Sequence, residues 1–288
     1  MATAPKTQYE TVARGYASYD HLPIAKLEKE LVTKAIGNCT ELSVLDLGGG
    51  NGQYARLAFE LGAELVDVLD ISPAMLAVGI EAESNIGREG KIRWFEADAT
   101  KALHHLSLIP GGYDIVMCNW LFDHATTDEV SMRRKRYCIF VLQKDQQYSK
   151  IIDTVRYPYT IVQELESMWR NASTQLKPGG KLVNVRATGL FDTDHVKSGK
   201  YGLTLSRLTS IPGGVRYQVT VHIDPPFEFE GTTLEASASL SNEINHRNGF
   251  ADLEVLKPED TEVVRSDEAF WKDFVEEPFC VVLTARKP

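Results

Sequence analysis

The chain has 288 residues, of which 43% are hydrophobic and 25% charged, and a formal net charge of −9. This composition and length predict one globular domain over residues 1–288 rather than two equal domains. Nucleic acid partners require a basic surface, so the acidic balance argues against them. We find no apolar run long enough to cross a bilayer and no signal core, and therefore expect a cytoplasmic protein with no membrane partner.

Hydrophobic periodicity predicts helices and strands in alternation over the first two thirds of the chain. The predicted elements are helices at 8–20 and 23–36, a strand at 43–47, a helix at 53–61, a strand at 64–69, a helix at 73–83, strands at 92–96 and 113–118, a helix at 164–176 and a strand at 181–186. Such alternation is typical of a doubly wound α/β fold, in which helices cover both faces of a mostly parallel sheet.

The last third of the chain departs from this alternation. It predicts β-segments at 214–223 and 227–234, a helix at 237–248 that Gly249 ends, and closing strands at 251–256 and 279–285. We expect a smaller β-rich unit here, added to the main sheet.

Residues 130–163, VSMRRKRYCIFVLQKDQQYSKIIDTVRYPYTIVQ, interrupt the pattern. They hold seven Lys or Arg and two Asp in an otherwise acidic chain. Without them TTDE joins ELESMWRNASTQLKPGG, which forms one amphipathic helix with apolar residues at helical spacing. The segment opens on Val-Ser-Met and closes on Gln, which the border sequences of a spliced intron would encode. A translated retained intron and a genuine basic surface insertion are both open interpretations.

The stretch VLDLGGGNG, Val44–Gly52, places four glycines in five positions directly after a predicted strand. A turn that lets a ligand touch the backbone needs positive φ and no Cβ, and the helix that follows offers free N–H groups to an anion. Gly50 to Ala55 satisfies the dinucleotide pattern GxGxxG/A, and Asp70 lies twenty residues beyond Gly50. The glycines alone therefore fit either a dinucleotide or S-adenosylmethionine.

Further motifs favour S-adenosylmethionine. Gly48 follows the strand at once, which gives Gly48-x-Gly50-x-Gly52 with Asp46 inside the strand, and FEADAT and LKPGGKLV flank later strands. The ordered set VLDLGGGNG, VLDIS, ADA, YDIVMCNWLFDHA and LKPGG resembles the class I S-adenosylmethionine-dependent methyltransferases of the small-molecule type, over about residues 9–185 apart from the insertion. The resemblance implies a seven-stranded sheet with a C-terminal antiparallel strand, and residues 189–236 as a lobe that covers the substrate.

The resemblance also implies the cofactor-binding residues. The glycine backbone passes beneath the methionine and ribose, Asp70 accepts the ribose hydroxyls with Ile71 beside it, and Asp98 meets the adenine amino group while Ala99 leaves room for the ring. Asp46 braces the loop or faces the ligand's ammonium group. Asn119 and Trp120 lie near the sulfonium. Tyr9, Tyr16 and Tyr19 resemble the N-terminal aromatic lid of the family, although an aromatic helix packed on the core explains them as well. The full set is Tyr19, Asp46, Gly48, Gly50, Gly52, Asp70, Ile71, Asp98, Ala99, Asn119 and Trp120.

The reaction that follows from the resemblance is methyl transfer to a small-molecule acceptor. A general base is needed only for some acceptors, and the candidates are Asp123, His124, His195 and His222. Five aromatic residues of the lobe either wall an apolar pocket or form the core of the lobe: Phe191, Tyr201, Tyr217, Phe227 and Phe229. No His or Cys spacing points to a metal. A rearrangement or elimination on the same fold, a non-catalytic binding partner and an NAD(P)-dependent oxidoreductase are the alternatives, and the oligomeric state is open.

Overall fold

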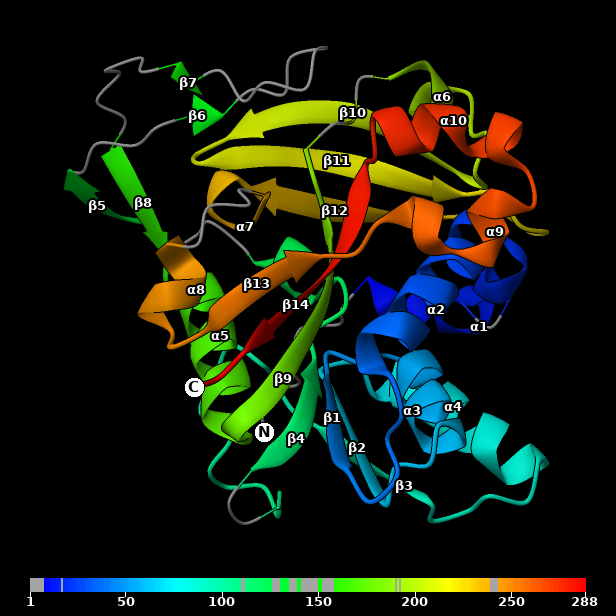
Figure 1. Cartoon of the computed structure of the whole chain (residues 1–288), viewed down its shortest axis with the longest axis vertical. Helices are drawn as coiled ribbons and strands as arrows, with labels where there is room; N and C mark the ends of the chain where they lie inside the picture. The colour runs from blue at the N-terminus through cyan, green and yellow to red at the C-terminus, as the bar shows by residue number, and fades with distance from the viewer. Residues whose placement is uncertain are drawn as a thin grey trace.

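The structure is a computed structural model of the chain (Figure 1). It describes residues 8–16, 18–109, 112–125, 130–134, 139–140, 150–151, 158–189, 191, 193–238 and 243–288.

A seven-stranded sheet organises the fold, with strand order β13-β14-β9-β4-β1-β2-β3. Its strands are β1 (Ser43–Leu47), β2 (Leu65–Asp70), β3 (Ile92–Glu96), β4 (Tyr113–Met117), β9 (Leu176–Ala187), β13 (Ala251–Val255) and β14 (Cys280–Arg286). Neighbouring strands run parallel except at β14, which is antiparallel to both β9 and β13. All five residues of β1 are buried, as the apolar run SVLDL predicts for a strand covered on both faces. The predicted mostly parallel sheet with a C-terminal antiparallel strand is confirmed.

Helices cover both faces of this sheet. The helices before and between the first strands are α1 (Tyr9–Tyr16), the short 3-10 helix η1 (Tyr19–His21), α2 (Pro23–Ile36), α3 (Gln53–Glu60) and α4 (Pro73–Asn85), and α5 (Gln163–Gln175) precedes β9. Successive residues of one strand belong to two different core clusters, Val44 to the cluster with α2 and α3 and Leu45 to the cluster with α5. Because strand side chains alternate between faces, α5 lies on the opposite face from α2 and α3.

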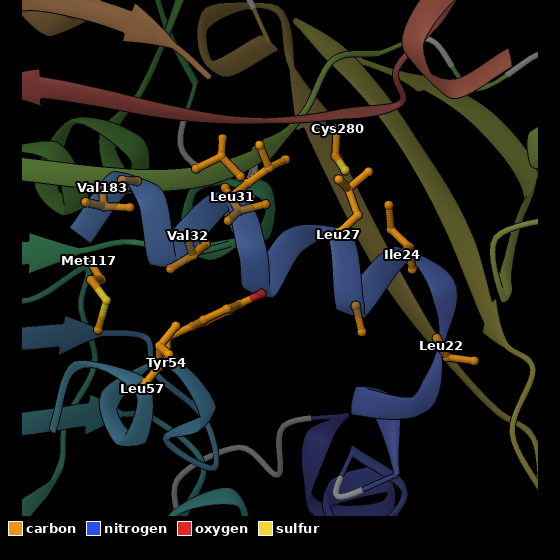
Figure 2. Packing of buried hydrophobic residues seen from close by; sticks show 14 of the residues in the cluster. Leu22, Ile24, Leu27, Leu31, Val32, Tyr54, Leu57, Met117, Val183 and Cys280 are labelled. Atoms are coloured by element: carbon orange, nitrogen blue, oxygen red, sulfur yellow. The ribbon is translucent and has the colours of Figure 1, made fainter. Parts of the chain in front are cut away.

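Helix α2 begins and ends where the sequence signals it. Pro23 occupies the first helical turn, and Gly37 follows the last residue with a φ of 73°. Its buried side chains Ile24, Leu27 and Leu31 lie on the side of Cys280 of β14, and Val32 lies on the side of Tyr54 of α3 (Figure 2). By contrast, the region predicted as a single helix over residues 8–20 contains two elements, α1, which ends at Tyr16, and η1, which begins at Tyr19.

The predicted β-rich unit is a separate three-stranded antiparallel sheet, at the top of Figure 1, and residues 191–234 that the structure describes are called the lobe below. It consists of β10 (Leu203–Ile211), β11 (Gly214–Val221) and β12 (Phe227–Leu234), preceded by α6 (Asp194–Lys197). Strand β10 was not predicted. The lobe is joined to the C-terminal helix α10 (Glu268–Glu276), where the Tyr201 ring stacks on Trp271 with a centroid distance of 4.9 Å.

The remaining C-terminal elements are short. The predicted helix at 237–248 corresponds to α7 (Glu235–Ala238) and α8 (Glu243–Arg247), with residues 239–242 outside the described part. The helices η3 (Pro258–Asp260), α9 (Glu262–Arg265) and α10 were not predicted.

Within the basic segment 130–163, the structure describes the backbone of short strands only. Strand β5 (Val130–Arg134) pairs with β8 (Pro158–Val162), β6 (Ile139–Phe140) pairs with β7 (Lys150–Ile151), and both pairs are separate from the seven-stranded sheet. Helix α5 begins at Gln163, directly after β8. The other residues of the segment lie outside the described residues, so its origin stays a prediction.

Candidate functional site

Polar residues gather where four neighbouring parallel strands end. Asp46 is the fourth residue of β1 and Asp70 is the last of β2, while Asp98 and Asn119 each follow their strand by two residues. Because β4, β1, β2 and β3 are consecutive in the sheet and parallel, their carboxyl ends lie along one edge. The structure thus brings together four segments that the sequence predicted to share one site.

The glycine loop after β1 has the backbone that its sequence demands. Gly48, Gly50 and Gly52 have φ values of 77°, 56° and 73°, which L side chains rarely adopt. A Cβ on Gly52 would lie 2.5 Å from the Trp94 ring, and a Cβ on Gly48 would lie 2.7 Å from Leu121. Packing inside the protein therefore requires two of these glycines, in addition to any ligand that approaches the loop.

Asp70 connects the loop to the end of β2. One carboxylate oxygen accepts a hydrogen bond from the Gly50 N–H at 2.8 Å and the other accepts one from the Ser72 N–H at 2.8 Å. Burial raises the pKa of Asp70, and these two bonds oppose the rise. Each carboxylate oxygen keeps a second acceptor site, so Asp70 can also receive two ligand hydroxyls. Ile71 follows with 46% of its surface exposed and offers an apolar face beside that carboxylate.

One of the two carboxylate oxygens of Asp98 accepts hydrogen bonds within its own turn. Its Oδ1 accepts hydrogen bonds from the backbone N–H and the hydroxyl of Thr100, at 2.8 and 2.6 Å. Its Oδ2 accepts none from the described residues. Ala99, the next residue, is buried, and its carbonyl accepts a hydrogen bond from the Asn171 side chain at 2.7 Å. Asp98 therefore has one free oxygen, and the chain behind it is held by α5.

Asp46 is a buried carboxyl group with little to stabilise its charge. Its exposed fraction is 1%, and neither oxygen accepts a hydrogen bond from the described residues. Burial, reinforced by the charge of Asp70, raises its pKa to about 7, although the nearby Ala55 N–H acts to lower it. An unpaired buried carboxylate is costly, so of the two predicted roles the bracing of the loop by hydrogen bonds has little support. The other predicted role of Asp46, facing a cationic group of a ligand, remains open to it.

The turn after β4 is fixed on both sides. Trp120 has a φ of 61°, and its N–H donates to the Val185 carbonyl at 2.7 Å. The Asn119 side-chain oxygen accepts from the Val185 N–H at 3.1 Å, while its buried Nδ2 has no hydrogen bond to the described residues. This left-handed residue turns the chain over the end of β4, and the orphaned amide is a donor available to a ligand.

Helix α1 lies across this edge of the sheet and contacts three other segments. The Glu10 carboxylate accepts a hydrogen bond from the Ser72 hydroxyl at 2.7 Å, and the Tyr9 hydroxyl lies 2.9 Å from His124 Nε2. The Tyr16 ring packs on Phe227 of the lobe with centroids 5.0 Å apart. Both interpretations of the N-terminal aromatics describe part of this arrangement, since α1 packs on the lobe and also covers the strand ends.

The structure separates the four candidate bases into two groups. Asp123 and His124 lie in the 3-10 helix η2 (Leu121–His124), directly after Trp120 and under α1. His195 instead packs between Tyr201 and Phe279 beside α10, and the exposed His222 lies near Gly199 on the lobe. Neither His195 nor His222 joins the residues at the strand ends.

Asp123 and His124 differ in what they can do. The Asp123 carboxylate is buried and accepts hydrogen bonds from the Ala187 N–H and the Thr233 hydroxyl, both at 3.3 Å, and burial raises its pKa to about 7. Burial lowers the pKa of His124 to about 4, which keeps the imidazole neutral at pH 7. A neutral imidazole has one ring nitrogen free to accept a proton, whereas the Asp123 oxygens are held within the fold.

The lobe aromatics also fall into two groups. Phe191, Tyr201 and Tyr217 are buried and form the core of the lobe, with Phe191 and Tyr217 ring centroids 4.5 Å apart. Phe227 and Phe229 are partly exposed and face the tyrosines of α1. The apolar wall predicted for the acceptor is thus restricted to two of the five residues. Among the described residues, no cluster of three His, Cys, Asp or Glu side chains could hold a metal ion, and no helix could span a bilayer.

Two residues of this region were not predicted, Glu28 and Glu10. Glu28 of α2 accepts hydrogen bonds from Tyr19, Tyr54 and Trp120. One signal was available for it, because Glu28 follows Ile24 by four residues and precedes Leu31 by three, which places an acid on the apolar stripe of the helix. Nothing in the sequence distinguishes Glu10 from an ordinary solvated acid.

Known proteins match this chain by sequence in one region and by fold throughout. The family model described as "Methyltransferase domain" matches residues 44–139. No curated protein matches the chain by sequence. An S-adenosylmethionine-dependent methyltransferase from Mesorhizobium loti superposes with a TM-score of 0.54 at 16% identity and covers 93% of this chain and 99% of its own. The CcbJ methyltransferase from Streptomyces caelestis superposes with a TM-score of 0.54 at 16% identity, and the match covers 97% of this chain and 96% of CcbJ. The [4+2]-cyclase SpnF superposes with a TM-score of 0.53 at 14% identity, and the match covers 99% of this chain and 98% of SpnF.

The order of the sheet distinguishes between the two cofactors that the glycines left open. A dinucleotide fold runs 3-2-1-4-5-6 with all strands parallel, whereas here the last strand of the chain, β14, inserts antiparallel between β9 and β13. The domain matched over residues 44–139 and the fold of the chain are those of the class I S-adenosylmethionine-dependent methyltransferase family. S-adenosylmethionine is the cofactor of that family.

Proposed function

We propose that the protein transfers a methyl group from S-adenosylmethionine to a small-molecule acceptor. The observation that carries the proposal is the convergence of the glycine loop, Asp70, Asp98 and Asn119 at one edge of the sheet. The residues fit the cofactor by three tests: glycines with positive φ line the loop, Asp70 and Asp98 have acceptor capacity left, and the buried Asp46 and Asn119 atoms have no hydrogen bond within the described chain.

Each end of the cofactor has a chemically matched group. Asp70 would accept the ribose hydroxyls, with Ile71 against the adenine ring and the free Oδ2 of Asp98 toward the adenine amino group. The unpaired Asp46 carboxylate would offset the charge of the methionine ammonium group. When bound, S-adenosylmethionine supplies an electrophilic methyl group on a sulfonium sulfur.

The acceptor would lie between the turn after β4, helix α1 and the lobe. Tyr9, Tyr16, Phe227 and Phe229 border this region, so an acceptor with an apolar or aromatic body fits it best. These side chains also exclude water and align the acceptor, which is the main task of the protein in a displacement on an already activated donor.

For a hydroxyl acceptor we propose His124 as the proton acceptor. Its imidazole is neutral at pH 7 and shares a 2.9 Å hydrogen bond with the Tyr9 hydroxyl. The acceptor proton would pass to Tyr9 Oη while the Tyr9 proton passes to His124 Nε2, which leaves an oxygen nucleophile and an imidazolium ion. General base catalysis of this kind contributes about 10²- to 10⁴-fold in rate.

Transfer of label tests the proposal. The protein is incubated with S-adenosylmethionine that carries a labelled methyl group, together with a panel of phenols, alcohols and amines with apolar bodies. We expect labelled product and stoichiometric S-adenosylhomocysteine with at least one acceptor class. Conversion of a compound without transfer of label would instead favour a rearrangement or elimination on the same fold.

A further inference from the structure

A second buried acid lies close to the candidate site but outside the set of strand-end residues. Glu28 is in the middle of α2 and has an exposed fraction of 1%. Its Oε2 accepts hydrogen bonds from the Tyr54 hydroxyl at 3.0 Å and the Trp120 indole at 3.2 Å, and its Oε1 accepts one from the Tyr19 hydroxyl at 3.3 Å. In Figure 2 the Tyr54 ring extends from α3 to α2 with its hydroxyl at the helix. One carboxyl group thus connects η1, α2, α3 and the turn after β4.

Stability does not explain why an acid occupies this position. Neighbouring positions on the same face of α2 hold Ile24, Leu27 and Leu31, and an apolar residue there would avoid the desolvation of a charge. Its four hydrogen-bond donors, Tyr19, Tyr54, Trp120 and the Cys280 thiol, are all neutral, and no Lys or Arg in the described part of the chain forms an ion pair with Glu28. When it is ionised, the carboxyl group therefore brings a negative charge into the interior without a protein cation to match it.

Two of the residues that donate hydrogen bonds to Glu28, Trp120 and Tyr19, also belong to the candidate site, and they indicate where its charge acts. Trp120 is the left-handed residue of the turn after β4, and Tyr19 closes the N-terminal aromatic segment. Hydrogen bonds to an ionised acceptor are stronger than those to a neutral one, so an ionised Glu28 holds both side chains more firmly. Burial raises the pKa of Glu28 to about 7 while Trp120, Tyr54 and Tyr19 lower it, and a cation brought close to the carboxyl group would favour its ionised form further.

We propose that Glu28 is a positioning residue for the sulfonium group of the cofactor. It fixes Trp120 and Tyr19, and its charge favours this sulfonium over the neutral thioether of the product. This inference rests on the proposed function, since it assumes that S-adenosylmethionine binds at the strand ends. It assigns to the chain a means of releasing S-adenosylhomocysteine after transfer, because the product lacks the positive charge that the carboxylate stabilises.

Glu28→Gln tests the inference, because it keeps the size of the side chain and removes the charge. The dissociation constants of S-adenosylmethionine and S-adenosylhomocysteine are measured by calorimetry for the wild type and the variant. We expect the affinity for S-adenosylmethionine to fall about tenfold and that for S-adenosylhomocysteine to change by less than about threefold. Glu83→Gln is the matched control, since Glu83 of α4 is about as buried but is paired, at 3.3 Å, with Arg88, which follows the helix. It should leave the ratio of the two affinities unchanged.

The outcomes separate a charge effect from a structural one. Equal losses for both ligands in Glu28→Gln, or no loss for either, would overturn the inference. If that variant folds poorly, judged by its melting temperature, Glu28→Asp takes its place, because its shorter side chain moves the charge away without removing it. A ratio of S-adenosylmethionine to S-adenosylhomocysteine affinity identical to that of the wild type would then contradict the inference. Failure of the wild type to bind either ligand would instead overturn the proposed function, without bearing on how Glu28 holds Trp120.

Discussion

Asp46→Asn should stabilise the protein in alkaline solution, which is an unusual expectation for a residue at a functional site. The Asp46 carboxyl is buried, has no hydrogen bond on either oxygen within the described chain, and has a pKa raised by burial to about 7. In the unfolded chain an aspartate releases its proton near pH 4. Between these two values the folded state holds a proton that the unfolded state has lost, so stability decreases as the pH rises from about 4 to about 7.

The size of the effect follows from the separation of the two pKa values. A raised folded pKa of about 7 against about 4 for the unfolded chain corresponds to at most about 4 kcal/mol of destabilisation above pH 7. Asparagine carries no charge and escapes this cost, but its buried amide also needs partners, which reduces the gain to about 2 kcal/mol. At pH 5 the cost of ionisation is only about 1.4 kcal/mol, which the cost of the buried amide cancels, so no net gain is expected there.

Urea unfolding of the wild type and Asp46→Asn at pH 5 and pH 8 measures this difference. Asp114→Asn, near the start of the neighbouring strand β4, is a control of opposite sign. Burial acts to raise the pKa of Asp114, but hydrogen bonds from Lys177 and Ser43 outweigh it and lower that pKa. The control should therefore be less stable than the wild type at pH 8 and by a similar amount at pH 5, because a lowered pKa contributes stability that is lost only as the pH falls below about 4. A gain for Asp46→Asn that is equal at the two pH values, or absent at pH 8, would refute the reasoning.

Three further predictions concern the loop, the ribose carboxylate and the proposed base. Asp70→Ala removes the acceptor of the Gly50 and Ser72 N–H groups, and we expect S-adenosylhomocysteine affinity to fall at least tenfold in calorimetry; unchanged affinity would mean that the ribose binds elsewhere. His124→Gln should lower kcat for a hydroxyl acceptor by about 10²-fold and leave S-adenosylhomocysteine affinity within about twofold, whereas an unaltered kcat would assign the base to another group. Gly52→Ala must fit a Cβ 2.5 Å from the Trp94 ring at a φ of 73°, so it should cost about 2 to 4 kcal/mol in urea unfolding, and a loss below about 0.5 kcal/mol would show that the loop is not constrained.

The central strands and helices were predictable because their signals are local. The apolar run of β1 and the Pro23 and Gly37 boundaries of α2 give the same elements in sequence and structure. Strand β10 was not predicted, because its alternation of Leu203 and Leu205 breaks at a register shift between Ser206 and Thr209, where Arg207 has a φ of 52°. A bulge of this kind changes which face a side chain occupies and removes the period-two pattern.

The C-terminal helices illustrate a different limit. Helix α10 has a clear start signal, since the Asp267 side chain accepts a hydrogen bond from the Phe270 N–H at 3.0 Å. Its nine residues bury Trp271 and Phe274 against the lobe, and that partner surface is what stabilises so short a helix. The sequence contains the cap but not the distant ring of Tyr201 on which the helix packs.

The residues of the candidate site likewise divide into those that local sequence signals predict and those that depend on distant packing. Asp70 and Asp98 were predicted because a parallel sheet brings the ends of its strands together, whatever the loops do. The choice of His124 over His195 and His222 was not predictable, because it depends on where α1 and α10 pack. The role of Glu28 depends on hydrogen bonds from residues far along the chain, such as Trp120, 92 residues away, for which no local pattern exists.

Parallel calorimetric titrations of the wild-type protein with S-adenosylhomocysteine and NADH test the central claim most directly. If the strand ends bind a sulfur-containing nucleoside, S-adenosylhomocysteine binds with one site per chain and NADH gives no heat of binding. Saturable binding of NADH with none of S-adenosylhomocysteine would contradict the account, and the glycine loop would then belong to a dinucleotide.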